Sequence, residues 1–172
     1  KNPAIYGNPL VEGVFEMGSV IKALTIASGI DSNVITASST YYDTGSLTLN
    51  SKTISNYDGK ARGNVSMQEV LSQSLNTGVA HIAMKMGNES FSNYFKSFGL
   101  GTETGIDLPG ETKGLINNLD SKRQIEIVTA SYGHGIALTP IATVRALATL
   151  ANGGYLVTPH LVKEIKYDSG VS

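Results

Sequence analysis

The chain has 172 residues, of which 41% are hydrophobic and 16% charged, a balance that indicates one folded domain and excludes an intrinsically disordered chain. Its 13 basic and 14 acidic side chains give a formal charge of −1, which argues against nucleic acid as a partner. Because the chain has no cysteine, it can form no thiol nucleophile, thiolate metal site or disulfide.

The first predicted helix covers residues 17–30. Residues 1–18 contain closely spaced prolines and glycines and are expected to form a loop. The following run carries a single charge, and its apolar residues recur at helical spacing up to Gly29, which predicts a buried helix that ends there. No segment is apolar over the length of a membrane span, and the chain as given is expected to be soluble.

Short strands and hairpins are expected over residues 31–64, which are rich in β-branched and turn-forming residues. A serine at 66 with a glutamate three residues later forms a capping box and predicts a helix that ends near residue 74. Apolar spacing predicts two further helices over 77–86 and 90–98.

The last third of the chain is predicted to contain two helices. Residues 99–111 form a turn-rich loop, and residues 121–131 have moderate helical character. The clearest amphipathic helix covers 139–151, with Pro140 at its first position. Residues 155–167 alternate in hydropathy like a hairpin.

Ser19 and Lys22 form the first candidate site, of the serine–lysine type. A serine in the first turn of a helix lies near unpaired backbone N–H groups, and a lysine three residues later lies on the same face. If that helix is buried, desolvation lowers the lysine pKa and makes its amine a usable general base. The alternative is an ordinary helix cap beside a lysine that extends to water.

Ser74 and Asn76 form the second candidate site, because they fall between two predicted helices, where their side chains can face a cleft. Both residue types are also common helix caps, so the alternative is again structural. The three histidines have no partners at metal-ligand spacing and are expected at the surface, so no metal and no cofactor are predicted.

Considered together, these segments resemble the transpeptidase domain of class B penicillin-binding proteins. The resemblance covers nearly the whole chain, and its order and spacing are those of that family. It is carried by five blocks: FEMGSVIK (15–22), DTGS with KTISNYDGKARGNVSMQEVLSQSLNTG (43–46 and 52–78), FGLGTETGIDLPGE (98–111), ASYGHGIALTPIATVRALATLANGG (130–154) and PHLVKEI (159–165).

The resemblance implies a peptidoglycan D,D-transpeptidase that cross-links stem peptides and is inhibited by β-lactams. Ser19 would be the nucleophile and Lys22 its proton acceptor. Ser74 would relay a proton to the leaving amine, and the Asn76 amide would hold Lys22 and the substrate backbone. The implied fold is α+β, of the penicillin-recognising serine transpeptidase and β-lactamase type.

The chain departs from the family in lacking the third motif, Lys-Thr/Ser-Gly. Residues 1–172 are therefore expected to be a single partial transpeptidase domain, truncated at both ends, mainly the helical lobe with short hairpins and inactive alone. The parent would lie at the extracytoplasmic face of the bacterial cytoplasmic membrane and work with a glycosyltransferase of the septal or elongation machinery, in cell division or cell shape. A serine β-lactamase and a non-catalytic penicillin-binding sensor or scaffold lobe are the alternatives.

Overall fold

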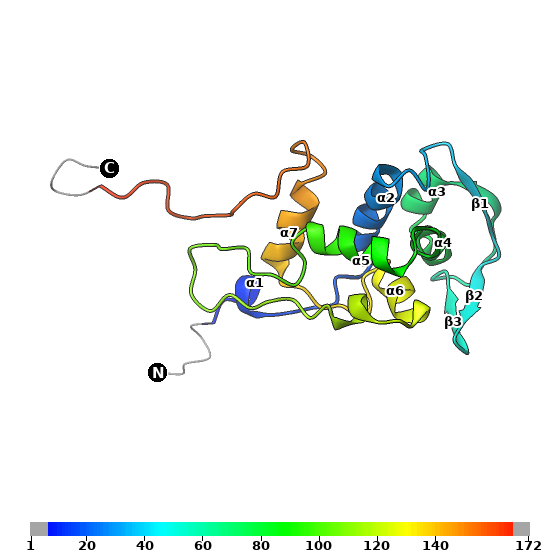
Figure 1. The fold of residues 1–172 in the computed structure, drawn as a ribbon, viewed down its shortest axis with the longest axis horizontal. Coiled ribbons are helices and arrows are strands. Elements are labelled where there is room, and N and C mark those ends of the chain that lie inside the picture. Colours follow the sequence, from blue (N-terminus) through cyan, green and yellow to red (C-terminus); the bar gives the residue numbers. More distant parts are fainter. Residues whose placement is uncertain (1–6, 167–172) are drawn as a thin grey trace.

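Helices form the centre of the structure, a computed structural model that describes residues 7–166 (Figure 1). Two small sheets lie at one end, and the segment after the last helix extends from the other. The helices are α1 (Pro9–Glu12), α2 (Lys22–Asp31), α3 (Met67–Ser72), α4 (Asn76–Met86), α5 (Asn88–Ser97), α6 (Gln124–Ala130) and α7 (Pro140–Ala148), with 3-10 turns η2 (Gly18–Ile21) and η3 (Asn117–Asp120).

Each sheet has two antiparallel strands. Strand β1 (Thr40–Asp43) pairs with β4 (Gly63–Ser66), and β2 (Ser46–Leu49) forms a hairpin with β3 (Lys52–Ser55). No larger sheet is present in residues 7–166. This confirms the expected α+β fold, mainly a helical lobe with short hairpins.

The main core lies between α2, α4 and α5. Leu24 of α2 and Ile82 of α4 are fully buried, and α2 packs directly on α4. On α5, the rings of Phe91 and Phe95 pack against each other in a tilted arrangement, with ring centroids 4.1 Å apart. Burial of this apolar face is what stabilises helices too short to persist alone.

The predicted helix starts are largely correct where a capping side chain is present. The Ser66 hydroxyl accepts the Glu69 N–H at 3.3 Å, and the Glu69 carboxylate accepts the Ser66 N–H at 2.9 Å. Thr139 caps α7, whose first residue is Pro140. The sequence-level capping box and N-terminal proline are therefore confirmed.

Three predictions about the secondary-structure elements are wrong. Helix α2 continues to Asp31, because Gly29 lies inside the helix and allows close packing on α4. The expected loop before it contains one helical turn, α1, because Asn8 caps that turn and Pro9 suits its first position.

The third error concerns the hairpin expected over 155–167. Up to residue 166, the described part of this segment forms no strand. Its backbone instead bonds to a distant loop: the Asp107 carboxylate accepts hydrogen bonds from the backbone N–H groups of Leu161 and Val162 at 2.7 and 2.8 Å. Within residues 7–166, no helix combines the length and apolar character that crossing a bilayer requires.

Candidate active site

Ser19 lies in the 3-10 turn η2, which runs directly into α2. The Lys22 N–H donates to the Ser19 carbonyl and closes this turn. The Ser19 residue is exposed, so its hydroxyl can be reached from solvent. Its position at the start of a continuous helical segment places its backbone at the positive end of the helix dipole.

Lys22 is almost completely buried, with 2% of its surface exposed. Its Nζ donates to two atoms of Ser74, the carbonyl oxygen at 2.6 Å and Oγ at 2.9 Å. Burial lowers the pKa of Lys22 from 10.5 to about 8. The structure thus shows the desolvated amine that the apolar sequence around Lys22 predicts.

Ser74 occupies the turn between α3 and α4 in a left-handed backbone conformation, with φ of 54°. A non-glycine residue adopts this conformation at some cost in free energy. In this conformation the carbonyl and the hydroxyl both meet the Lys22 amine. The structure therefore brings together Lys22 and Ser74, which are 52 positions apart in the sequence.

Asn76 is the first residue of α4, and its partner differs from the one that the family resemblance implies. Its Nδ2 donates to the backbone carbonyl of Ser55, at the end of β3, at 2.9 Å. The expected hold of this amide on Lys22 is absent among the hydrogen bonds of residues 7–166. The end of the β2–β3 hairpin therefore determines how this side chain is oriented.

A loop at residues 131–135, far from Ser19 in the sequence, packs against the turn that carries Ser19. The Gly18 N–H donates to the Gly133 carbonyl at 3.3 Å, and Thr25 Oγ1 donates to the Ser131 carbonyl at 2.7 Å. Gly133 has φ of +81°, and a Cβ there would lie 2.2 Å from the Gly18 oxygen. Only glycine fits this position.

The same loop contacts Glu16, three residues before Ser19. The Glu16 carboxylate accepts the Gly135 N–H at 2.7 Å and lies 3.3 Å from His134 Nδ1. Sequence reasoning assigned no role to these residues. The Gly-His-Gly pattern was the available signal, since two glycines around one residue suggest a tight backbone approach.

The histidines show one difference from expectation. His81 is half-buried and stacks on Tyr41, with ring centroids 5.5 Å apart, and burial, followed by the nearby Lys85 charge, lowers its pKa. His134 and His160 are exposed. In residues 7–166 no group of three or more carboxylate and imidazole side chains could hold a metal ion.

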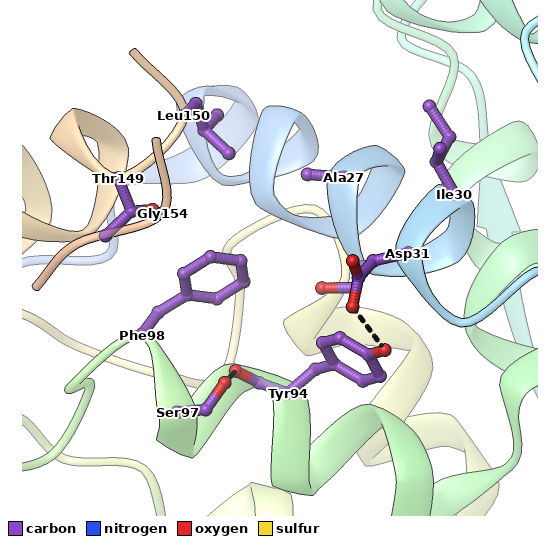
Figure 2. Close-up of a pocket in the computed structure, with 10 residues that line it drawn as sticks. Ala27, Ile30, Asp31, Tyr94, Ser97, Phe98, Thr149, Leu150 and Gly154 are labelled. Atoms are coloured by element: carbon purple, nitrogen blue, oxygen red, sulfur yellow. Dashed lines mark hydrogen bonds between the residues drawn. The ribbon is translucent and has the colours of Figure 1, made fainter. Parts of the chain in front are cut away.

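A cavity of about 540 Å³ lies beside the far end of α2, between α5 and the segment after α7 (Figure 2). Its walls include Ala27, Phe98 and Leu150, and on one side the Tyr94 hydroxyl donates to the Asp31 carboxylate at 2.7 Å. None of the four candidate site residues lines this cavity, so it is separate from the candidate active site.

Comparison with known proteins identifies the same class along the whole chain. The family model described as the penicillin binding protein transpeptidase domain matches residues 2–171. Stage V sporulation protein D of Bacillus subtilis is 32% identical over 165 residues, which cover 95% of this chain and 26% of that protein. A probable peptidoglycan D,D-transpeptidase FtsI of Caulobacter vibrioides is 33% identical, over 86% of this chain and 24% of that protein.

Solved structures show the same fold. The crystal structure of penicillin binding protein 3 from Mycobacterium tuberculosis matches with a TM-score of 0.88 and 26% identity, over 96% of this chain and 37% of that one. The chain thus spans about a quarter of the length of these curated relatives.

Proposed function

Because the chain belongs to the penicillin binding protein transpeptidase domain family, we propose that it is part of a peptidoglycan D,D-transpeptidase that forms an acyl-enzyme on Ser19. The observation that carries this proposal is the buried Lys22 amine, which lies one helical turn after Ser19 and is bound to Ser74. Relatives named as D,D-transpeptidases support the same reaction class.

The first step is acylation. A neutral amine has two N–H bonds and one lone pair. Ser74 accepts from Lys22 at two oxygens, so the lone pair remains for the Ser19 proton. As Ser19 Oγ bonds to the carbonyl carbon of the penultimate D-alanine, its proton passes to Lys22, and the Ser19 N–H stabilises the developing oxyanion.

The second half of acylation breaks the peptide bond. The terminal D-alanine leaves as an amine, which receives a proton from Lys22 through the Ser74 hydroxyl, and an ester remains on Ser19. The amine of a neighbouring stem peptide then attacks that ester: the new amide bond forms the cross-link, the bond to Ser19 Oγ breaks, and the amine proton passes through Lys22 to Ser19 Oγ. A β-lactam acylates Ser19 by the same attack, but its leaving group stays attached to the acyl chain.

Asn76 would act as a polar contact for the substrate backbone at the rim of the site. Its amide is oriented by the Ser55 carbonyl and is partly exposed, so it keeps hydrogen-bonding capacity for a peptide. The second oxyanion donor and the residues that bind the terminal carboxylate would come from the Lys-Thr/Ser-Gly strand of the family, outside residues 1–172. In this proposal the catalytic unit includes that strand together with residues 1–172.

The cellular setting follows from the same family. A peptidoglycan cross-linking enzyme works where its polymer lies, at the extracytoplasmic face of the bacterial cytoplasmic membrane. The stem peptides are the substrates, and a glycosyltransferase of the septal or elongation machinery would supply the glycan strand.

Labelling of the full-length protein with a fluorescent penicillin tests the proposal. We expect one stable adduct, which peptide mass spectrometry assigns to Ser19, and no adduct in Ser19→Ala. Ser90→Ala, at a partly exposed position of α5, is the matched control and should label like wild type. Labelling of the Ser19→Ala variant would overturn the proposal, and rapid loss of the label with hydrolysed drug would identify a β-lactamase instead.

A further inference from the structure

The lobe contains a buried carboxylate that the reaction described above does not use. Asp43, at the end of β1, is 0% exposed. Its Oδ1 accepts hydrogen bonds from the Gly45 N–H at 2.9 Å and from Thr77 Oγ1 at 2.8 Å. The Asn56 Nδ2 donates to both carboxylate oxygens, at 3.1 and 2.9 Å.

These hydrogen bonds keep the Asp43 carboxylate ionised. Burial alone would raise its pKa, but the donors from Gly45, Thr77 and Asn56 outweigh burial and hold the pKa below the usual value for aspartate. An ionised group with four close donor contacts is strongly fixed in orientation. Asp43 can therefore determine the geometry of the groups around it.

Asn56 transmits this geometry to α4. While its Nδ2 faces Asp43, its Oδ1 accepts from the Thr77 N–H at 3.3 Å and lies 2.9 Å from the Thr77 hydroxyl. An amide has its donor and its acceptor at opposite sides, so Asp43 decides which side of Asn56 faces α4. The first turn of α4 is thereby joined to the end of β3.

The residues next to Asn56 and Thr77 in the sequence connect this cluster to the candidate active site. Ser55, beside Asn56, presents the carbonyl that accepts from Asn76 Nδ2 at 2.9 Å. Asn76, beside Thr77, lies two residues after Ser74, which binds the Lys22 amine. A single buried cluster therefore fixes both the Ser55 carbonyl and the helix turn that carries Asn76.

We propose that Asp43 is a positioning residue for acylation, which orients the Asn76 side chain through Asn56 and the Ser55 carbonyl. The proposal rests on the proposed transpeptidase function for its kinetic consequence. Asp43 itself does not contact the substrate. Its effect on the reaction passes through Asn76, and this makes the effect separable from a general loss of folding.

A double-mutant cycle in the full-length protein tests the proposal. Acylation of Ser19 by a fluorescent penicillin is measured in wild type, Asp43→Asn, Asn76→Ala and the double variant. We expect Asp43→Asn to lower the rate at saturating drug by about tenfold to a hundredfold, because small displacements of a positioning group have effects of this size. In the Asn76→Ala background, Asp43→Asn should cause no further loss. If the two losses multiply, Asp43 does not act through Asn76 and the proposal is wrong.

Two further variants keep the test decisive. Asp58→Asn changes a partly buried carboxylate that lies two residues after Asn56 and pairs with Arg62, and it should acylate like wild type. If Asp43→Asn fails to fold, Thr77→Val removes one donor to Asp43 at nearly constant shape, and its smaller loss should also vanish with Asn76→Ala. A loss that persists in that background would contradict the proposal.

A measurement that does not depend on acylation distinguishes the positioning role of Asp43 from the proposed function. The Asn76 side-chain amide is observable by nitrogen-15 NMR, and its proton shift reports the hydrogen bond to Ser55. Asp43→Asn should move this signal, and Asp58→Asn should not. Wild-type protein that is not acylated at Ser19 would overturn the proposed function, whereas an unmoved Asn76 signal would overturn the positioning role.

Discussion

At the scale of single residues, the main feature is a buried lysine whose two hydrogen-bond partners are both atoms of one uncharged serine. Lys22 donates to the carbonyl and the hydroxyl of Ser74, and no carboxylate neutralises it among the hydrogen bonds and ion pairs of residues 7–166. Burial then disfavours the ammonium form and lowers the pKa to about 8. Near neutral pH a useful fraction of the amine is able to accept a proton.

The pH dependence of acylation follows from this. A protonated Lys22 cannot accept the Ser19 proton, so the acylation rate should fall by about tenfold for each pH unit below the pKa. Above it the rate should level off, with a midpoint at the pKa of about 8. Stopped-flow acylation of the full-length protein from pH 6 to 9.5 measures this profile, with circular dichroism as the control for folding. A flat profile would contradict a base role for Lys22.

Gly133 gives a second prediction at this scale. Gly133→Ala places a Cβ 2.2 Å from the Gly18 oxygen and demands a left-handed conformation at residue 133. The Gly18 turn must move, and Ser19 moves with it. We expect loss of about 1–3 kcal/mol of stability from the strain and a decrease in acylation of at least about tenfold. Denaturant unfolding and penicillin labelling measure the two effects.

Gly154→Ala is the matched control for Gly133→Ala. Gly154 also has a positive φ, of +88°, but a Cβ there meets no other atom within 4 Å. It should therefore show the conformational strain without the change in acylation. Equal acylation losses in both variants would contradict the link between Gly133 and the Ser19 turn.

At the scale of elements, sequence periodicity predicts most helices because each buries one apolar face. The capped starts of α3 and α7 are local in the sequence and were predictable for that reason. The role of Gly29 was not predictable from the sequence. The packing of α4 on α2 shows that this glycine allows the two helices to come close together and does not end α2. Local signals mark an element, and its partners decide where it ends.

The candidate active site also has features that the sequence predicts and contacts that it does not. The spacing of Ser19 and Lys22, and the apolar run around them, are visible in the sequence. The bond from Lys22 to Ser74 and the bond from Asn76 to Ser55 join residues 52 and 21 positions apart. Such contacts depend on how the elements pack, and the spacing of residues along a single sequence contains no direct signal of them.

Gly29→Ala tests the packing of α2 on α4. The added Cβ would lie 2.7 Å from Ile82 Cγ2 and 3.0 Å from Ile35 Cγ1, so both side chains or the helix must shift. Although alanine favours a helix, overpacking should dominate and lower the free energy of unfolding by about 1–3 kcal/mol. Denaturant unfolding measures the change.

Lys85→Ala, at an exposed position of α4, is the control for that experiment and should unfold within about 0.5 kcal/mol of wild type. If Gly29→Ala is instead as stable as Lys85→Ala, or more stable, then α2 and α4 do not pack as closely as the structure shows.

At the scale of the whole molecule, large apolar side chains are exposed around the Ser19 turn and on α1 and α7. They include Phe15, Val20, Leu10 and Val144, each at least half exposed. Leu10 and Val144 lie on elements that contact each other, α1 and α7, and exposed apolar residues that lie together are typical of surfaces covered by other protein. This agrees with the proposal that the catalytic unit extends beyond these residues.

The isolated chain of residues 1–172 should therefore acylate slowly. Loss of one oxyanion donor alone reduces the rate by about 10²- to 10³-fold. We expect labelling by fluorescent penicillin to be slower than in the full-length protein by at least this factor, with circular dichroism and thermal unfolding showing that the fragment is folded. Equal rates would mean that residues 1–172 contain every catalytic group.

The backbone contact between Gly18 and Gly133 has a consequence for antibiotic resistance. If Ser19 carries the drug, the turn that presents it is braced by a loop 115 positions away in the sequence. A substitution in that loop would then slow acylation of Ser19 by the drug through the shape of the turn. Surveillance for resistance should therefore include residues 131–135 as well as Ser19 and its sequence neighbours.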